Sequence, residues 1–428
     1  MESRARHNAA LNVLGEGIWG FQVGLVATAT VLVLLLRHFR AGERTVGCVG
    51  AIEGGLVLVF QMLGPRLFHR RTGLKRALVR WHLCVILPPY ALIAACAFWG
   101  WRLPPDLVIG LILAAFAVFM AGIGVILAVW LDWLARLFPV AMRGRAFGYG
   151  WAASALAGSA GSLISGWAIG RFQAPQIYGW LYGAAWVVGT ASILTFLFMA
   201  DPQDAVSENS ELAGKEPPSL LELRRLALAT LSDRTTRSIL FSRLLVVAGF
   251  SFAPFTALYF LSPAGGSLGA STVVAAGAAA TAGAALGHLV FGTLGDRHGH
   301  RRGAILGAMA QVACLAALLT WPGLAGCVIT CFCSGLAGAA LFLSYTNLFL
   351  ESCPHKDTSA HLAAVNIVSG VAGLICPVAA GMFAARYGLP MLFKAALTLS
   401  LLAAAVVLFV LRDPRHPPRS LEPSVFPN

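Results

Sequence analysis

The stretch Gly292-Thr-Leu-Gly-Asp-Arg-His-Gly-His-Arg-Arg302 gathers one carboxylate and several basic or titratable side chains around three glycines. Apolar runs of about 20 residues precede and follow it, which is the length that crosses a bilayer as an α-helix. The stretch is therefore predicted to be a tight, charged turn that joins two membrane-spanning helices on one side of the membrane.

The composition of the whole chain also indicates a membrane protein. Of the 428 residues, 58% are hydrophobic and 11% are charged, whereas roughly 45–50% and 25% are typical of soluble domains. The mean hydropathy is +0.77. The net charge of +13 does not indicate a nucleic-acid partner, because the basic residues fall in alternate connecting segments between apolar runs.

The chain is predicted to cross the lipid bilayer twelve times. The basic segment Met1–His7 leads into an apolar run of about 25 residues with no cleavage site, so a first transmembrane helix is expected and a removable signal peptide is not. The predicted spans are 10–35, 45–66, 76–99, 106–135, 146–170, 177–200, 238–262, 270–294, 302–320, 322–350, 361–385 and 389–411.

A polar stretch, 201–237, divides the spans into two sets of six. It contains Pro217-Pro218, and its middle, Leu220–Leu231, has helical apolar spacing and is expected to lie along the membrane surface. The predicted fold class is an all-α membrane protein with 12 transmembrane helices in two pseudo-symmetric six-helix bundles. The expected domains are a first bundle at 1–200, a cytoplasmic linker at 201–237, a second bundle at 238–411 and a tail at 412–428.

The distribution of Lys and Arg predicts that both termini are cytoplasmic. With that orientation, 23 of the 31 basic residues lie in inner segments and six lie in outer segments, as the positive-inside rule requires. The outer loop that carries Arg37, Arg40 and Arg44 opposes the rule. Arg243 and Lys394 fall inside spans.

An internal repeat supports the division into two halves. A shift of 215 residues places Phe138-Pro139 on Cys353-Pro354, and it also aligns Gly158 with Gly373, Gly166 with Gly381 and Arg171 with Arg386. The fifth and eleventh spans are therefore predicted to be counterparts in two parallel repeats.

The pattern G-x-L-x-D-R-x-G-x-R-R at 292–302 closely resembles the signature loop between the second and third helices of each half of a major facilitator superfamily transporter. Arg71-Thr-Gly73-Leu-Lys75-Arg76 is a partial first-half copy, with Arg70 in place of the family's acidic residue and Arg66 in place of a glycine. The resemblance implies two six-helix bundles around a central cavity, and alternating access by rocking of one bundle against the other.

The resemblance also implies a gate at the cytoplasmic end. We expect Asp296 to accept hydrogen bonds from helix-end amides, to pair with arginine and to hold the bundles together in one state. The alternative to gating is a charge cluster that only anchors the loop. For Glu351, which is also assigned to the gate, solvation of the helix end is an equal alternative. The predicted gate residues are Gly292, Asp296, Arg297, Gly299, Arg301, Arg302, Arg71, Gly73, Asp132, Arg136 and Arg143.

Charged residues deep in the spans are the candidates for the transport site, because burying a charge in a membrane is costly. Glu16 or Glu53 is expected to carry a proton across the conformational cycle, and a static pairing of either carboxylate is the alternative. The other predicted cavity residues are Gln22, Arg243, Tyr259, His288, Asn347 and Asn366.

The predicted function is secondary transport of a small solute, coupled to protons, by a functional monomer in a bacterial cytoplasmic membrane. A uniporter, or a non-transporting receptor or assembly factor with this fold, remains the alternative. No enzyme activity and no cofactor are expected, because the chain lacks a phosphate-binding G-x-x-x-x-G-K-[ST] motif, a nucleophile elbow and metal-ligand spacing. The nine cysteines lie almost all in apolar runs and are expected to be small buried hydrophobic residues.

Overall fold

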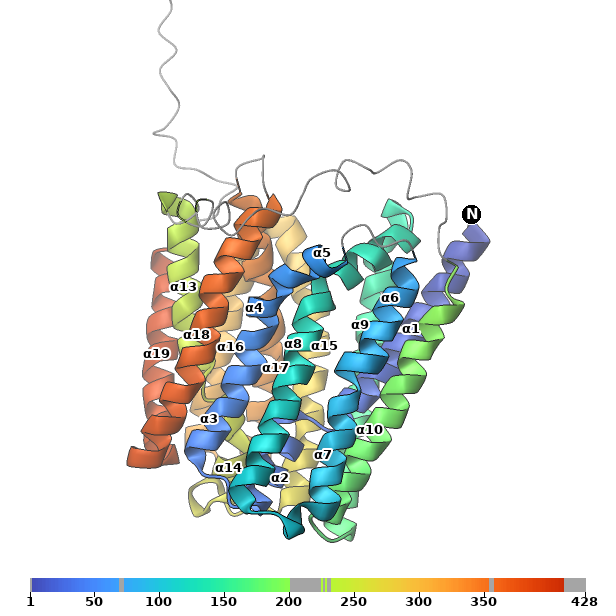
Figure 1. Ribbon diagram of the computed structural model, residues 1–428. Helices are drawn as coiled ribbons and strands as arrows, with labels where there is room; N and C mark the ends of the chain where they lie inside the picture. The colour runs from blue at the N-terminus through green and yellow to red at the C-terminus, as the bar shows by residue number, and fades with distance from the viewer. Residues whose placement is uncertain are drawn as a thin grey trace, which may run out of the picture.

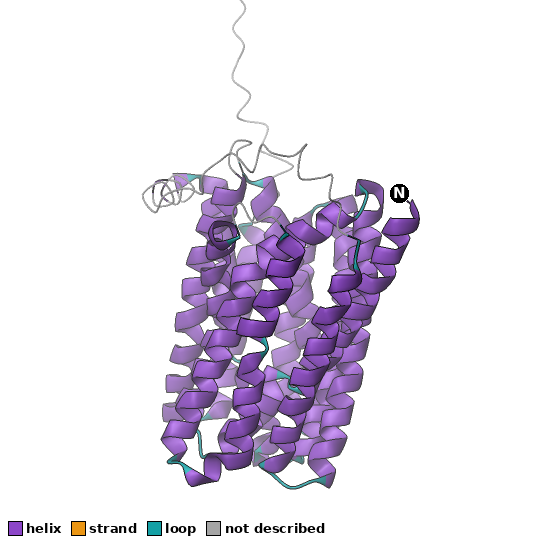
Figure 2. Cartoon of the chain, turned by 45° about the vertical axis from the view of Figure 1, so that its right-hand side comes forward, coloured by secondary structure: helices purple, strands orange, loops and turns teal. Residues whose placement is uncertain are grey.

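The computed structural model describes residues 2–68, 73–200, 232–353 and 358–411, together with Arg225 and Leu228. Within these residues the regular structure is helical throughout (Figure 2). Twelve helical stretches are long and apolar enough to cross a membrane. The predicted all-α class and the twelve spans are therefore confirmed.

The first six spans are built from short helical segments as well as long helices. Their bounds are α1 Glu2–Leu25, η1 Thr28–Leu32 and α2 Val33–His38; α3 Glu43–Ala51, η2 Ile52–Leu56, α4 Val57–Phe60, η3 Gln61–Leu63 and α5 Gly64–Leu67; α6 Leu74–Trp81, η4 His82–Ile86, α7 Pro88–Trp99 and η5 Gly100–Arg102; α8 Pro105–Leu137; α9 Val140–Arg171; and α10 Gln176–Thr195 with η6 Phe196–Phe198.

The last six spans are more regular. They comprise α13 Arg234–Phe250, η7 Ala253–Phe255 and α14 Thr256–Leu261, followed by η8 Pro263–Gly265; α15 Ala270–His298; α16 His300–Thr320; α17 Leu324–Glu351; α18 Thr358–Tyr387; and α19 Leu389–Phe409. Several helices extend beyond the predicted spans, because they continue through polar residues at their ends. The fifth helix, for example, begins at Val140 and not at 146.

All spans stand side by side, and the start of α1 and the end of α19 lie at the same end of the bundle (Figure 1). We call this end the inner face, after the predicted orientation. The predicted linker at 201–237 and tail at 412–428 fall mostly or wholly outside the described residues, as does most of the predicted surface helix Leu220–Leu231. The domain boundaries that depend on them stay predictions.

Local chemistry explains where key helices begin and end. The Asp233 carboxylate accepts a hydrogen bond from the backbone N–H of Thr236 at 2.6 Å, which caps the first turn of α13. Gly73 and Gly299 have φ of 73° and 84°, values that only glycine adopts at little cost. Each glycine directly precedes the third helix of its half.

The two halves meet along two helix pairs. α9 packs against α15, and α3, η2 and α4 pack against α18 (Figure 1). Gly166 and Gly381, which the 215-residue shift aligns, both lie at this interface. A Cβ on Gly166 would lie 2.7 Å from the backbone nitrogen of Ala275, and one on Gly381 would lie 2.8 Å from the carbonyl oxygen of Glu43. Small residues thus let the backbones of the two halves approach closely.

An apolar cluster joins the halves at the outer end of the bundle. Val33 and Val46 of the first half are fully buried against Phe252 and Phe255 of the second. In the loop beside it, Arg37 forms an ion pair with Glu43 at 3.2 Å and donates a hydrogen bond to a backbone carbonyl. The basic outer loop that opposes the positive-inside rule is therefore partly neutralised within itself.

The close approach of α1 and α9 within the first half predicts a position that tolerates no side chain. A Cβ on Gly20 would lie 2.0 Å from the carbonyl oxygen of Ser154. We expect Gly20→Leu to lower the stability of the purified protein by about 1–3 kcal/mol, as overpacking of a close contact does, measured as a lower Tm in detergent.

Gly183→Leu is the matched control, because a Cβ on Gly183 in α10 meets no other atom within 4 Å. An equal loss of Tm in the two variants would contradict the close α1–α9 contact.

Candidate functional site

The turn that opened the sequence analysis connects α15 to α16 at the inner face. α15 ends at His298, Gly299 reverses the chain with its positive φ, and α16 begins at His300. The N–H of Gly299 donates to the carbonyl of Gly295 at 3.0 Å, which closes the last turn of α15. The tight, charged turn that was predicted is present.

Arg301 in this turn holds the ninth span to the twelfth. Its Nε donates to the carbonyl oxygen of Leu411 and its Nη2 to that of Leu408, both at 2.6 Å. These carbonyls lie at the end of α19, where the helix lacks internal donors and where a positive charge is favourable. Both acceptors of Arg301 among the described residues lie in its own half, so these two hydrogen bonds do not bridge the bundles.

Lys75 makes the same arrangement in the first half. Its ammonium donates to the carbonyl oxygens of Leu197 and Met199 at 3.1 and 2.8 Å, at the end of the sixth span. Lys75 and Arg301 are the residues that align when Gly73 is placed on Gly299. The partial first-half copy of the loop thus keeps the contact that joins the third helix to the sixth.

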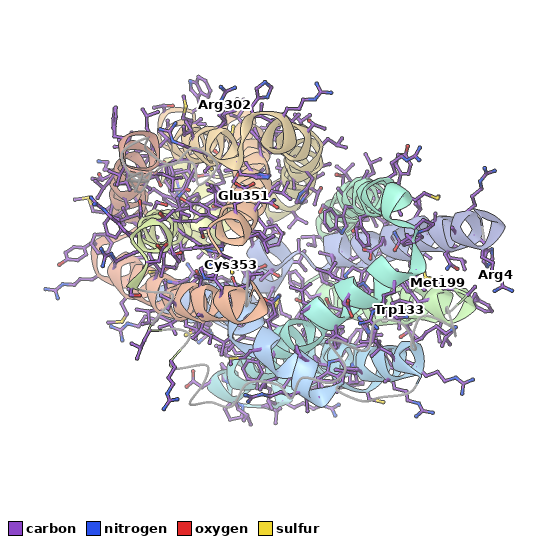
Figure 3. The ribbon with its side chains drawn as sticks, turned by 90° about the horizontal axis from the view of Figure 1, so that it is seen from above. Arg4, Trp133, Met199, Arg302, Glu351 and Cys353 are labelled. Atoms are coloured by element: carbon purple, nitrogen blue, oxygen red, sulfur yellow. The ribbon has the colours of Figure 1, made fainter. Side chains whose placement is uncertain are left out.

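The other gate candidates are only partly described. Arg297 and Arg302 are exposed, and Arg302 points away from the first half in the view from above (Figure 3). Gly292 lies in the last turns of α15, with no atom within 4 Å of an added Cβ. Arg71 and the side chains of Asp296 and Arg143 lie outside the described residues. The holding role of Asp296 therefore stays a prediction.

The acidic residues at the inner helix ends are paired within their own halves. Asp132 and Arg136 form an exposed ion pair, 2.5 Å apart, one turn from each other on α8. Glu351 at the end of α17 lies 3.6 Å from His300 Nε2 at the start of α16. Pairing of this kind fits stabilisation of the helix ends. Among the described side chains, neither Asp132 nor Arg136 contacts the other half, so their predicted gate roles stay predictions.

Glu53 lies where the second span departs from α-helical geometry. It is the eleventh residue of the span Glu43–Leu67 and belongs to a π-helical segment, η2; such segments occur often at functional sites. Its side chain is exposed and lies beside that of Thr28. Thr28 directly follows Ala27, where the first span leaves helical geometry with a ψ of 124°.

Two irregular segments of the second half meet the same region. A Cβ on Gly50, one turn before Glu53, would lie 2.6 Å from Cγ of Pro254 and 2.9 Å from Cβ of Pro377. Pro254 lies in η7, where the seventh span is interrupted, and Pro377 lies inside α18. Four irregular points therefore converge between the two halves: the breaks of the first and seventh spans, the π-segment of the second span and the proline of the eleventh.

Toward the inner face, polar and aromatic contacts continue the interface between the halves. Asn366 Nδ2 donates to Gln61 Oε1 at 3.4 Å, between α18 and η3. His288 of α15 lies 5.7 Å, ring to ring, from Trp151 of α9. In the view from above, the helices form two groups that meet along this interface (Figure 3).

Glu16 and Arg243 are both half-buried within spans. The Glu16 carboxylate lies beside the indole of Trp130, and its Cγ is 3.2 Å from where a Cβ on Gly150 would lie. The Arg243 guanidinium lies 5.5 Å from the ring centroid of Phe349. Neither side chain forms an ion pair with another described residue.

Three predicted cavity residues are placed elsewhere. Gln22 is fully buried inside the first half and donates to Tyr90 Oη at 2.7 Å. Tyr259 is buried in the outer apolar cluster, 4.9 Å ring to ring from Phe393. Asn347 donates to the carbonyl of Leu343 in its own helix at 2.9 Å. Polar residues in spans often form such contacts across or within helices, and one sequence does not separate them from cavity residues.

A cavity of about 660 Å³ lies within the first half, apart from all these carboxylates. Its lining includes Leu67, Arg76, Arg80 and Trp81. No group of three or more His, Cys, Asp or Glu side chains among the described residues could hold a metal ion. The cysteines range from fully buried, as Cys314 is, to exposed, as Cys84 is.

The functional geometry that sequence analysis missed consists of backbone irregularities. The break at Ala27 and the π-segments at 52–56 and 82–86 carry no proline and no motif. No sequence pattern predicts that Trp130 lies beside Glu16 or that Thr28 lies beside Glu53, because packing between spans brings these side chains together.

Comparison with known proteins agrees with this arrangement. The sequence model of one protein family, the Major Facilitator Superfamily, matches residues 270–426. A search of curated protein sequences finds no match. Three solved structures have the same fold. They are the nucleoside transporter NupG (13% identity, TM-score 0.62, covering 95% of this chain and 98% of that one), a bacterial homolog of the human lysosomal transporter Spinster (14%, 0.65, 95% and 97%), and the xylose transporter XylE from E. coli in a partially occluded inward-open conformation (12%, 0.64, 95% and 99%).

The paired helix-end contacts generate a stability prediction. Replacing Arg301 or Lys75 by Gln removes a cation from two carbonyls at a helix end, so each variant should lose about 1–2 kcal/mol of stability. A lower Tm of the purified protein in detergent is the expected measurement.

Arg302→Gln provides the control, because Arg302 is the adjacent residue, carries the same charge and is exposed. If Arg302→Gln lowers Tm as much as Arg301→Gln does, the lost stability comes from net charge and not from the helix-end contact.

Proposed function

We propose that this chain, a member of the major facilitator superfamily and a transporter rather than an enzyme, moves a small solute across the membrane by alternating access and couples that movement to protons. The observation that carries the proposal is Glu53, a carboxylate in a π-helical segment at the middle of a span, where irregular segments of both halves converge.

The position of Glu53 suits a proton carrier. A carboxylate at this depth is costly when charged and loses that cost when it takes up a proton. Thr28 beside it provides a hydroxyl that accepts a hydrogen bond from the protonated acid or donates one to the carboxylate. Protonation therefore changes the hydrogen bonding at the break of the first span.

The same change reaches the contact between the halves. Gly50, one turn from Glu53, lies against Pro254 and Pro377 of the second half. A shift of the second span at the π-segment alters this contact directly. We propose that proton uptake by Glu53 biases the equilibrium between an arrangement closed at the outer end and one closed at the inner end.

The inner loops complete the cycle in this proposal. Lys75 fixes the third helix to the sixth and Arg301 fixes the ninth to the twelfth, so each half moves as a unit. Asp296 then pairs with a partner across the inner face when that face closes. The first-half copy, with Arg70 in place of an acid, contributes less to closure.

The orientation follows from the distribution of basic residues. We propose that the inner face, with both termini, lies in the cytoplasm of a bacterial cell and that the chain works as a monomer in the cytoplasmic membrane. A uniporter would use the same fold without a proton, and a non-transporting receptor would show no flux, so a transport assay separates both alternatives from the proposal.

The test is uptake into proteoliposomes driven by an inside-alkaline pH gradient, with a panel of radiolabelled nucleosides, sugars, amino acids and dipeptides. For a solute that wild-type protein accumulates, Glu53→Gln should abolish accumulation against a gradient while exchange of solute without a pH gradient continues. Glu16→Gln is measured in parallel.

Asp106→Asn is the matched control, because Asp106 is an exposed carboxylate at the start of α8. Gradient-driven accumulation that survives both Glu53→Gln and Glu16→Gln rules out a proton-carrying role for either carboxylate. Flux that is insensitive to the pH gradient in wild type identifies a uniporter.

A further inference from the structure

Two charges of opposite sign, neither in an ion pair with a described residue, lie at corresponding depths in the two halves. The 226-residue shift that places Gly73 on Gly299 brings Glu16 of α1 to Ser242 of α13, next to Arg243. Glu16 lies nine residues before the end of α1 and Arg243 lies seven residues before the end of α13. Both helices end at the interruption of their span.

Each charge also rests on an aromatic ring from the corresponding neighbouring helix. Glu16 lies beside Trp130 of α8, and Arg243 lies 5.5 Å from the ring centroid of Phe349 of α17. A shift of 219 residues places Asp132 on Glu351, and the same shift places Trp130 on Phe349. The two halves therefore carry the same charge-and-ring unit, negative in the first and positive in the second.

Glu16 contacts a helix at the interface between the halves, and Arg243 contacts a helix that packs on that interface. Glu16 lies against Gly150 of α9, the helix that packs on the second half. Arg243 lies against α17, which packs on α15, the partner of α9.

The described residues around Arg243 provide a hydroxyl but no negative charge. The hydroxyl of Tyr345 lies close enough to interact electrostatically with Arg243, and it donates its hydrogen bond to Ser242 at 3.1 Å. No described carboxylate pairs with Arg243 and no described cation pairs with Glu16. A charge kept in a span without a partner marks a ligand pathway.

We propose that the transported solute is a zwitterion with an apolar body. Its ammonium group binds Glu16 of the first half, its carboxylate binds Arg243 of the second, and the apolar body packs against the half-buried ring of Trp130. This inference rests on the proposed transport function and adds the substrate class. A ligand of this kind satisfies both charges at once and contacts both halves, so its binding is linked to their approach.

The test measures binding to purified protein in detergent, with no membrane gradient. The probes are L-phenylalanine, L-leucine and glycyl-L-leucine, compared with 2-phenylethylamine, which lacks the carboxylate, and 3-phenylpropionate, which lacks the amine. At least one zwitterion should raise Tm, and its singly charged counterparts should bind about tenfold or more weakly, the loss expected for one charge-assisted hydrogen bond.

Two variants make the assignment of each charge testable. Glu16→Gln should weaken the zwitterion about tenfold or more and leave binding of 3-phenylpropionate unchanged, whereas Arg243→Gln should weaken the zwitterion and leave 2-phenylethylamine unchanged. This reciprocal pattern also shows that each variant is folded. Asp106→Asn and Arg102→Gln, at exposed outer positions, are the matched controls and should bind the zwitterion as wild type does.

Two results overturn the inference. One is the absence of stabilisation by any zwitterion in the set. The other is binding of the zwitterion by both Glu16→Gln and Arg243→Gln with wild-type affinity, since that would show that neither charge contacts the ligand. The proton-coupling proposal fails separately, because it is tested by gradient-driven uptake in Glu53→Gln and not by binding.

Discussion

The structure depends on close backbone contact between its two halves. A lipid bilayer provides no hydrophobic force between helices, so association depends on packing and on hydrogen bonds between spans. Glycines at 47, 166 and 381 allow that packing at the outer and middle levels. The contact is dense but has few directional bonds, which suits a surface on which one half rocks against the other.

Pseudo-symmetry explains both the rigidity of each half and the asymmetry of the site. Lys75 and Arg301 make the same helix-end contacts in the two halves, so the third helix is held to the sixth in both. The positions that face the interface have diverged in charge. Glu16 in one half corresponds to the neighbour of Arg243 in the other, and Glu53 lies only in the first. A symmetric scaffold thus holds an asymmetric set of charges.

Most of the fold could be predicted from the sequence, because apolar length and basic connecting segments follow directly from membrane physics. The turn at Gly299 and its first-half copy at Gly73 were identifiable from the spacing of their glycines and basic residues. The charged candidates were also identifiable, since charges are rare in spans. Their surroundings were not. Gln22 and Glu16 are both polar residues of the first span, and only helix packing places one inside a half and the other at its edge.

The central claim, that the halves pivot about the region of Glu53, is tested most directly by distances between spin labels in a cysteine-free background. One pair, at Arg145 and Thr293, reports on the inner ends of α9 and α15, and a second pair, at Phe172 and Ser267, reports on the outer end. Glu53→Gln, which mimics the protonated acid, is predicted to shift the two distance distributions in opposite directions. Distributions that shift together, or that do not respond to the substitution, would contradict the account.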